Sequence, residues 1–120
     1  MVAMKRIFGV LILGITVFDS WLGWLCVKAA HHTYPFSVPF VVTIVICSCV
    51  GLVAVGMNTR ATSLIHNGLV MLSLIPYFLA VGNWPGGDDG PGMGMVFIIG
   101  PTLLAATALA FISTIRLLEE

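Results

Sequence analysis

Charged residues are scarce in this chain. Asp, Glu, Lys and Arg make up 8% of the 120 residues, whereas roughly 25% is usual in a soluble domain. The five basic and five acidic side chains cancel to a formal net charge of zero, and no run of Lys or Arg occurs. Binding to nucleic acid and anchoring by a polybasic segment both depend on such runs, so we expect neither.

Patterns for catalysis are also missing. The sequence has no nucleophile placed with a base, no Gly-rich phosphate loop and no pair of acids at catalytic spacing. It therefore predicts a protein that is not an enzyme, with no catalytic residues and no cofactor. His66 is a candidate haem ligand, but without a matching histidine on another helix an interfacial or capping role is favoured.

Cysteine and histidine are few and poorly spaced for a metal site. Cys47 and Cys49 point about 200° apart on a helix, and Cys26 stands by itself. His31 and His32 are candidate ligands for a surface metal, but adjacent histidines do not easily point at one ion. We therefore predict no metal site and interpret these histidines as solvated loop residues.

Long apolar runs account for most of the chain, in which 59% of the residues are hydrophobic. A helix needs about 20 mostly apolar residues to span a bilayer. Four segments meet this requirement: 7–27, 38–57, 64–81 and 95–118. The sequence thus predicts an all-α membrane protein, with residues 1–120 forming a single transmembrane domain of four helices. The first run is longer than the apolar part of a signal peptide, so we expect it to remain as an uncleaved span.

Proline marks an expected irregularity in the third segment. Pro76 lies well inside this segment and leaves the carbonyl of Leu72 without its helical partner. We therefore predict a bend in the third helix at this point.

The distribution of basic residues predicts the orientation, because cytoplasmic connections carry the excess of Lys and Arg. Four of them fall on the side of the two termini: Lys5, Arg6, Arg60 and Arg116. Lys28 falls on the other side. We therefore expect two hairpins in a compact bundle, with both termini cytoplasmic. The compactness of the chain and the uncleaved first span lead us to expect a bacterial inner membrane. Three tryptophans are the expected anchors at the outer interface: Trp21, Trp24 and Trp84.

Small and polar residues recur at spacings of three and four along the predicted helices. Such a stripe allows two helix backbones to approach closely within a bilayer. The residues predicted to pack helices in this way are Gly23, Thr43, Cys47, Gly51, Ala54, Thr102, Ala106 and Ala110. Each of the four helices is expected to turn one such stripe toward the centre of the bundle.

Asp19 is the only ionisable residue near the middle of the membrane, where a charge costs about 3 kcal/mol on insertion scales. Its helical face also carries Thr16, and we expect an intramembrane polar site that includes Ser73 and Tyr77 of the third helix. Asp19 is predicted to form a hydrogen bond with Ser73, Tyr77 or both if the first and third helices touch. The favoured role is to fix helix register or to recognise a polar group on a partner. Transport of protons or cations is the alternative.

Three functions remain open. The favoured one is a non-catalytic accessory or interaction subunit of a larger inner-membrane complex, with the bilayer and other membrane subunits, or copies of itself, as partners. A second is a small homo-oligomeric transporter or channel that uses Asp19. In length, number of spans and one acid in the first span, the chain is similar in outline to small multidrug resistance transporters, although that family's acid is a glutamate. A membrane protein of the immunity type is the third.

Overall fold

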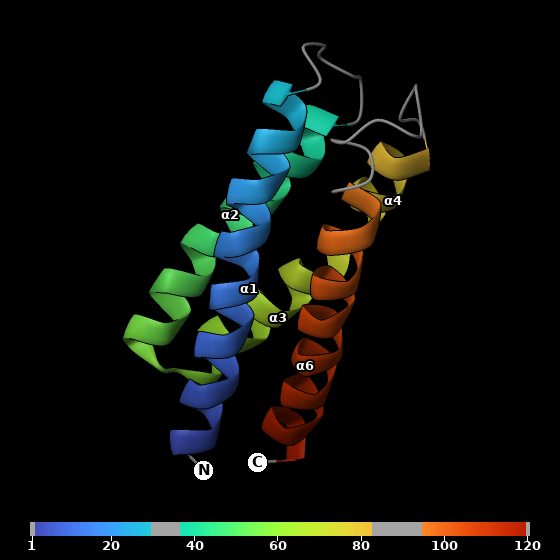
Figure 1. Ribbon diagram of the computed structural model, residues 1–120. Helices are drawn as coiled ribbons and strands as arrows, with labels where there is room; N and C mark the ends of the chain where they lie inside the picture. The colour runs from blue at the N-terminus through green and yellow to red at the C-terminus, as the bar shows by residue number, and fades with distance from the viewer. Residues whose placement is uncertain (1, 30–36, 83–94, 120) are drawn as a thin grey trace.

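The computed structural model describes residues 2–29, 37–82 and 95–119, and all of its regular elements are helices (Figure 1). They are α1 (Val2–Ala29), α2 (Ser37–Met57), α3 (Arg60–Leu72), α4 (Leu74–Gly82), the π-helix η1 (Met95–Ile99) and α6 (Gly100–Glu119). Four stretches are long and apolar enough to cross a membrane: Arg6–Cys26, Val38–Met57, Arg60–Gly82 and Val96–Glu119. The predicted all-α architecture with four potential spans is therefore confirmed.

The turn between α2 and α3 consists of two residues. Asn58 adopts a positive φ of 52°, which asparagine tolerates better than most residues, and its backbone N–H donates to the carbonyl of Ala54 at 2.8 Å. Thr59 caps α3, since its hydroxyl accepts from the backbone N–H of Thr62 at 3.3 Å. This cap starts α3 at Arg60, ahead of the apolar segment from which its beginning was predicted.

The predicted interruption of the third span is present. α3 ends at Leu72 and α4 begins at Leu74, so the break lies at Ser73, three residues before Pro76. The backbone N–H of Ser73 donates to the carbonyl of Leu69 at 2.9 Å, and its hydroxyl donates to the carbonyl of Val70. The backbone N–H and the hydroxyl of Ser73 are thus both hydrogen-bonded, next to the point where Pro76 interrupts the helical hydrogen bonds.

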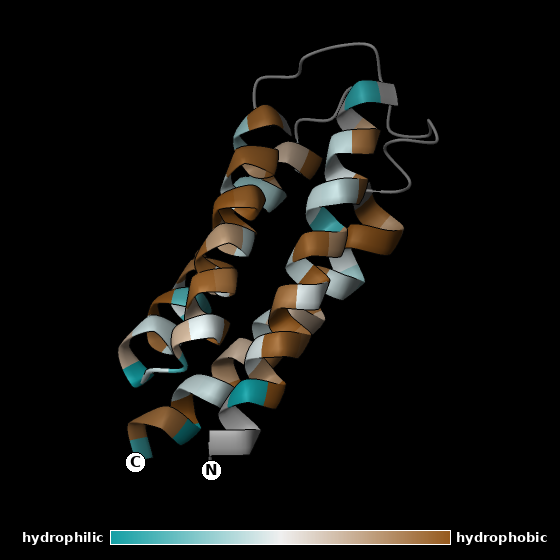
Figure 2. Cartoon of the chain, turned by 90° about the vertical axis from the view of Figure 1, so that its left-hand side faces the viewer, coloured by the Kyte–Doolittle hydropathy of each residue, from teal (hydrophilic) through white to brown (hydrophobic). Residues whose placement is uncertain are grey.

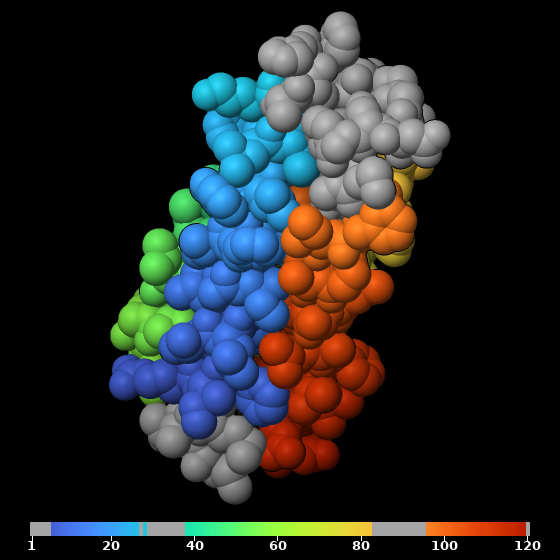
Figure 3. Space-filling view, in the orientation of Figure 1, coloured from blue at the N-terminus to red at the C-terminus, as the bar shows by residue number. Residues whose placement is uncertain are grey.

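The helices form a four-sided bundle. α1 packs mainly against α2 and α6, and α3 packs against the same two helices, so α1 and α3 lie diagonally across the bundle. The beginning of α1 and the end of α6 lie at the same end of the molecule (Figure 1). In the space-filling view, α1 and α6 lie side by side in close contact over much of their length (Figure 3).

Polar side chains are buried while large apolar ones cover the exterior. Among the described residues, the buried polar side chains are Thr16, Asp19, Ser48, His66, Asn67, Ser73 and Ser113. Hydrophobic residues dominate the middle of the helices, and most hydrophilic ones lie toward the ends (Figure 2). By length and composition the four helices suit contact with a lipid bilayer, which is the architecture of an integral membrane protein.

Candidate functional site

The Asp19 carboxyl lies inside the bundle, where none of its surface is exposed. The hydroxyl Oγ1 of Thr102, on α6, donates to Asp19 Oδ1 at 2.6 Å. Asp19 Oδ2 has no hydrogen-bond partner in the described structure. One oxygen of the carboxyl therefore ties α1 to α6, and the other is left with unused capacity to accept a hydrogen bond.

The hydrogen bond of Asp19 corrects the expectation for its partner. The Ser73 hydroxyl donates to the carbonyl of Val70 instead, and the Thr16 hydroxyl donates to the carbonyl of Leu13 at 2.9 Å. The reason is the diagonal placement of α1 and α3, which makes α6 the neighbour that reaches Asp19. Helical periodicity places Asp19 on an inward face but does not identify the helix opposite it.

Tyr77 is buried with the other residues of the predicted polar site, at 4% exposure. Its ring packs edge to face against Phe40, with the ring centroids 5.4 Å apart. Tyr77 also belongs to the buried cluster that contains Phe40, Ile99 and Leu103, whereas the hydrogen bond of Asp19 goes to Thr102 of α6.

Thr102 occupies an irregular part of the last span. It follows Pro101 and the π-helix η1, and its Oγ1 lies 3.0 Å from the carbonyl oxygens of both Ile98 and Ile99. A hydroxyl has a single proton to donate, so three oxygen acceptors compete for it. Thr102 was predicted to pack helices, and its contact with Asp19 is an additional role that the spacing of small residues did not reveal.

A second link between helices joins Ser20 to Ser48. Their hydroxyl oxygens lie 3.1 Å apart, between α1 and α2. Each hydroxyl also lies within hydrogen-bond distance of a carbonyl of its own helix, Ser20 of Thr16 at 2.7 Å and Ser48 of Ile44 at 3.0 Å, so two hydroxyl protons are shared among three contacts. Sequence reasoning missed this pair because serine bonded to its own helix gives no distinctive spacing.

Most of the predicted packing residues lie in the interior. The buried ones are Gly23, Cys47, Gly51, Ala54, Ala106 and Ala110, whereas Thr43 and Thr102 are half-buried. Gly51 makes the closest approach: a Cβ at this position would lie 2.7 Å from His66 Nε2 and 2.9 Å from Leu13 Cδ1. Thr43 donates to the carbonyl of Pro39 at 2.7 Å, within its own helix.

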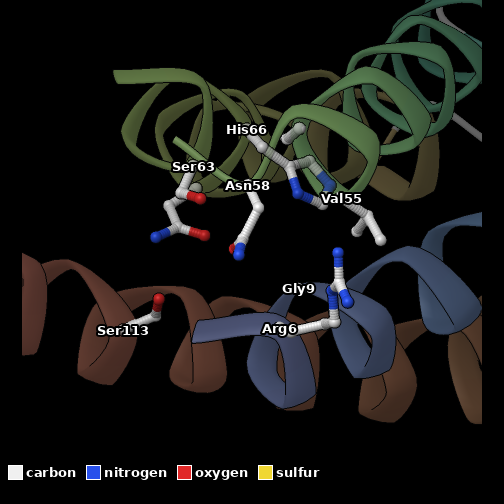
Figure 4. Close-up of a pocket in the computed structure, with 9 residues that line it drawn as sticks. Arg6, Gly9, Val55, Asn58, Ser63, His66 and Ser113 are labelled. Atoms are coloured by element: carbon white, nitrogen blue, oxygen red, sulfur yellow. The ribbon is translucent and has the colours of Figure 1, made fainter. Parts of the chain in front are cut away.

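A second polar cluster lies between α1, α2, α3 and α6 (Figure 4). His66 and Asn67 of α3 are 1% and 2% exposed, and His66 Nε2 and Asn67 Nδ2 have no hydrogen-bond partner in the described structure. They line a small pocket together with Arg6, Asn58, Ser63 and Ser113. The sequence predicted only an interfacial or capping role for His66, and the close fit against Gly51 could not be seen before the helices were placed.

The remaining predicted residues are distributed as follows. Trp21 and Trp24 are on the exterior, at 59% and 56% exposure. Within residues 2–29, 37–82 and 95–119, no group of three His, Cys, Asp or Glu side chains lies close enough to hold a metal ion. His31, His32 and Trp84 fall outside the described residues.

Comparisons with known protein families, with curated proteins and with solved structures found no match to this chain.

Proposed function

We propose that this protein is a non-catalytic membrane subunit that binds a transmembrane helix of a larger complex. The observation that carries the proposal is a groove on the exterior of the bundle between α2 and α3. Five residues line it: Cys49, Val50, Val53, Thr62 and Ile65. Its volume is about 300 Å³, and its lining is apolar except for the sulfhydryl and hydroxyl groups.

Shape matters more than apolarity for such a surface. Lipid tails are as apolar as leucine, so helices associate in a bilayer through close packing and hydrogen bonds. A groove of this volume can accept large side chains from one face of a second helix. Thr62 also lines it, although its hydroxyl already donates to the carbonyl of Thr59 at 3.2 Å. The buried polar groups support the same function, because Asp19–Thr102 and Ser20–Ser48 link helices of this chain to one another.

The proposal includes an orientation in a bacterial inner membrane. We place both termini in the cytoplasm, with α1 and α2 as one hairpin and α3, α4 and α6 as the other. The support is the excess of basic residues on the side of the termini, where Arg6, Arg60 and Arg116 lie opposite Lys28. The other partners proposed are lipid and copies of this chain.

Cys49 provides a direct test, because it lines the groove and is exposed while Cys26 and Cys47 are buried. A variant with Cys26→Ala and Cys47→Ala would carry a photoactivatable maleimide at Cys49 in native membranes. Irradiation is expected to yield one discrete protein adduct.

A matched control places the same reagent elsewhere at similar depth. Phe111→Cys lies on the exposed surface of α6, diagonally across the bundle from α2, and is expected to give no such adduct. Adducts of lipid only at both positions, or the same protein adduct at both, would contradict docking in the groove.

A second candidate function is proton or cation transport by a homo-oligomer, and one observation favours it. Asp19 Oδ2 is buried without a partner beside the irregular η1–α6 junction, and ionisable groups inside membrane bundles often mark ion pathways. Reconstituted vesicles would separate the two functions. Transport requires a flux that Asp19→Asn abolishes, whereas an interaction subunit gives equal background flux in both proteins.

A further inference from the structure

Six of the nine residues that line the pocket beside His66 have side chains that can donate hydrogen bonds, and the other three are Gly9, Ala54 and Val55. Its volume is about 10 Å³, which is room for roughly one water-sized group. Figure 4 shows Arg6, Asn58, Ser63, His66 and Ser113 around this space, contributed by α1, the α2–α3 turn, α3 and α6. Three regions far apart in the sequence thus converge on one small polar space: α1, the stretch from the end of α2 into α3, and α6.

Two of the lining side chains are buried with unused polar atoms. His66 Nε2 and Asn67 Nδ2 lack hydrogen-bond partners although both residues are almost fully buried. An amide nitrogen is a donor, and an imidazole nitrogen that carries a proton is a donor as well. Buried donors are costly to leave unpaired, so an acceptor placed beside Asn67 Nδ2 and a protonated His66 Nε2 would complete their hydrogen bonding.

The charge of the lining indicates the sign of that acceptor. Arg6 contributes a guanidinium group, and none of the described lining residues carries a carboxylate. The guanidinium of arginine pairs with planar oxyanions through two parallel hydrogen bonds. A water molecule would also satisfy His66 and Asn67, but only an anion would in addition pair with the positive charge of the exposed Arg6.

One side of the pocket lies at the level where the spans end, while His66, Asn67 and Ser113 lie six or seven residues inside their spans. Arg6 is the first residue of the first span, Asn58 follows the last residue of the second, and Ser63 is in the first turn of the third. The phosphate groups of lipids and dissolved phosphate are both found at this boundary between hydrocarbon and water.

We propose that this pocket binds one oxygen of a phosphate group beside His66 and Asn67, while the rest of the phosphate lies outside the small space, next to the exposed Arg6. A lipid headgroup and a free phosphate ion offer the same chemistry. The site is separate from the α2–α3 groove, so its occupation does not depend on the docking function proposed above.

The experiment measures thermal unfolding of the purified full-length protein in a non-ionic detergent by tryptophan fluorescence. One arm titrates inorganic phosphate against sodium chloride at equal ionic strength. The other titrates dihexanoyl phosphatidylglycerol against dihexanoylglycerol, which lacks the phosphate. A saturable rise in the unfolding midpoint is expected in at least one arm, and the responding arm identifies the source. No saturable rise in either arm would overturn the proposal.

Matched variants locate the site. Arg6→Gln and the nearly isosteric Asn67→Asp are each expected to weaken apparent affinity roughly tenfold to a hundredfold, as for the loss of a hydrogen bond to a charged group. Arg60→Gln makes the same charge change at the first residue of α3, outside the pocket lining, and is expected to change affinity less than about twofold.

Two comparisons separate loss of the site from misfolding and from a general effect of the positive charge at this end of the bundle. Arg6 is exposed, so Arg6→Gln is expected to keep the circular dichroism spectrum and the elution volume of the parent protein. An affinity loss in Arg60→Gln equal to that in Arg6→Gln would mean that phosphate responds to the overall charge of this end, and the proposed site would be rejected.

Discussion

The two polar regions of the bundle differ in how they are packed. Around Asp19 and Thr102 the interior holds bulky side chains, among them Phe40, Ile99 and Leu103, and the carboxyl bonds directly to the opposite helix. Around His66 the neighbouring positions are small, Gly51 and Ala54, and a pocket remains. A polar group among large neighbours links helices, whereas one among small neighbours leaves room for a ligand.

The largest effect is expected from filling the space beside His66. In Gly51→Ala the added Cβ would meet His66 Nε2 at 2.7 Å and Leu13 at 2.9 Å, so the side chains must shift. Overpacking of this kind costs about 1–3 kcal/mol, to be measured as the free energy of unfolding in mixed micelles. Phosphate binding should weaken as well.

Gly14→Ala is the matched control, since a Cβ at Gly14 meets nothing within 4 Å. It is expected to leave the unfolding free energy unchanged or to raise it by up to about 1 kcal/mol, because alanine favours helix over glycine. Equal losses from the two glycine variants would show that the close fit at Gly51 has no special importance.

An intermediate effect is expected from the link between α1 and α6. Thr102→Val keeps the shape of the side chain but removes the donor to Asp19 Oδ1, leaving a buried carboxyl without its hydrogen bond. The unfolding free energy should fall by about 1–2 kcal/mol. Chemical denaturation in mixed micelles measures this change.

Thr107→Val provides the comparison for that variant. The Thr107 hydroxyl is also half-buried on α6, but it donates to the carbonyl of Leu103 in its own helix at 2.9 Å. The unfolding free energy should fall clearly less in Thr107→Val than in Thr102→Val. If the two valine variants are equally stable, the Thr102–Asp19 hydrogen bond adds no more stability than the bond of the Thr107 hydroxyl within its own helix.

The smallest effect is expected from the Ser20–Ser48 link. A double-mutant cycle of Ser20→Ala and Ser48→Ala should give a coupling energy of about 0.6 kcal/mol, typical of hydrogen bonds between membrane helices. Both hydroxyls retain carbonyl partners on their own helices, which limits the loss. A coupling energy as large as the full loss in Thr102→Val would show that the Ser20–Ser48 link stabilises the bundle as much as the Thr102–Asp19 bond does.

Sequence reasoning succeeded where the information is local. The length of each apolar run sets a potential span, and Pro76 removes a backbone donor wherever the neighbours lie, so the four spans and the break near Ser73 could be predicted. The periodic spacing that placed Asp19 on an inward face is local in the same sense.

Other features depend on how the helices are arranged around one another. Asp19 bonds to Thr102 because α6 is adjacent to α1 while α3 is diagonal to it, and spacing along one helix carries no such information. The fit of His66 over Gly51 and the convergence of Arg6 on the same pocket are likewise contacts between distant segments. The π-helix before Pro101 is a local feature, but proline also permits a simple kink.

The joint at Ser73 has a consequence for how the protein meets bilayers of different thickness. α3 and α4 contain 13 and 9 residues, so neither reaches the roughly 20 residues that a crossing requires, and the two must enter the bilayer together. A small change of angle between them alters the reach of this crossing along the membrane normal while every turn on either side keeps its hydrogen bonds. The third crossing can thus follow a thinner or thicker membrane by bending, whereas α1 and α2, which are continuous, adjust by tilting as whole rods.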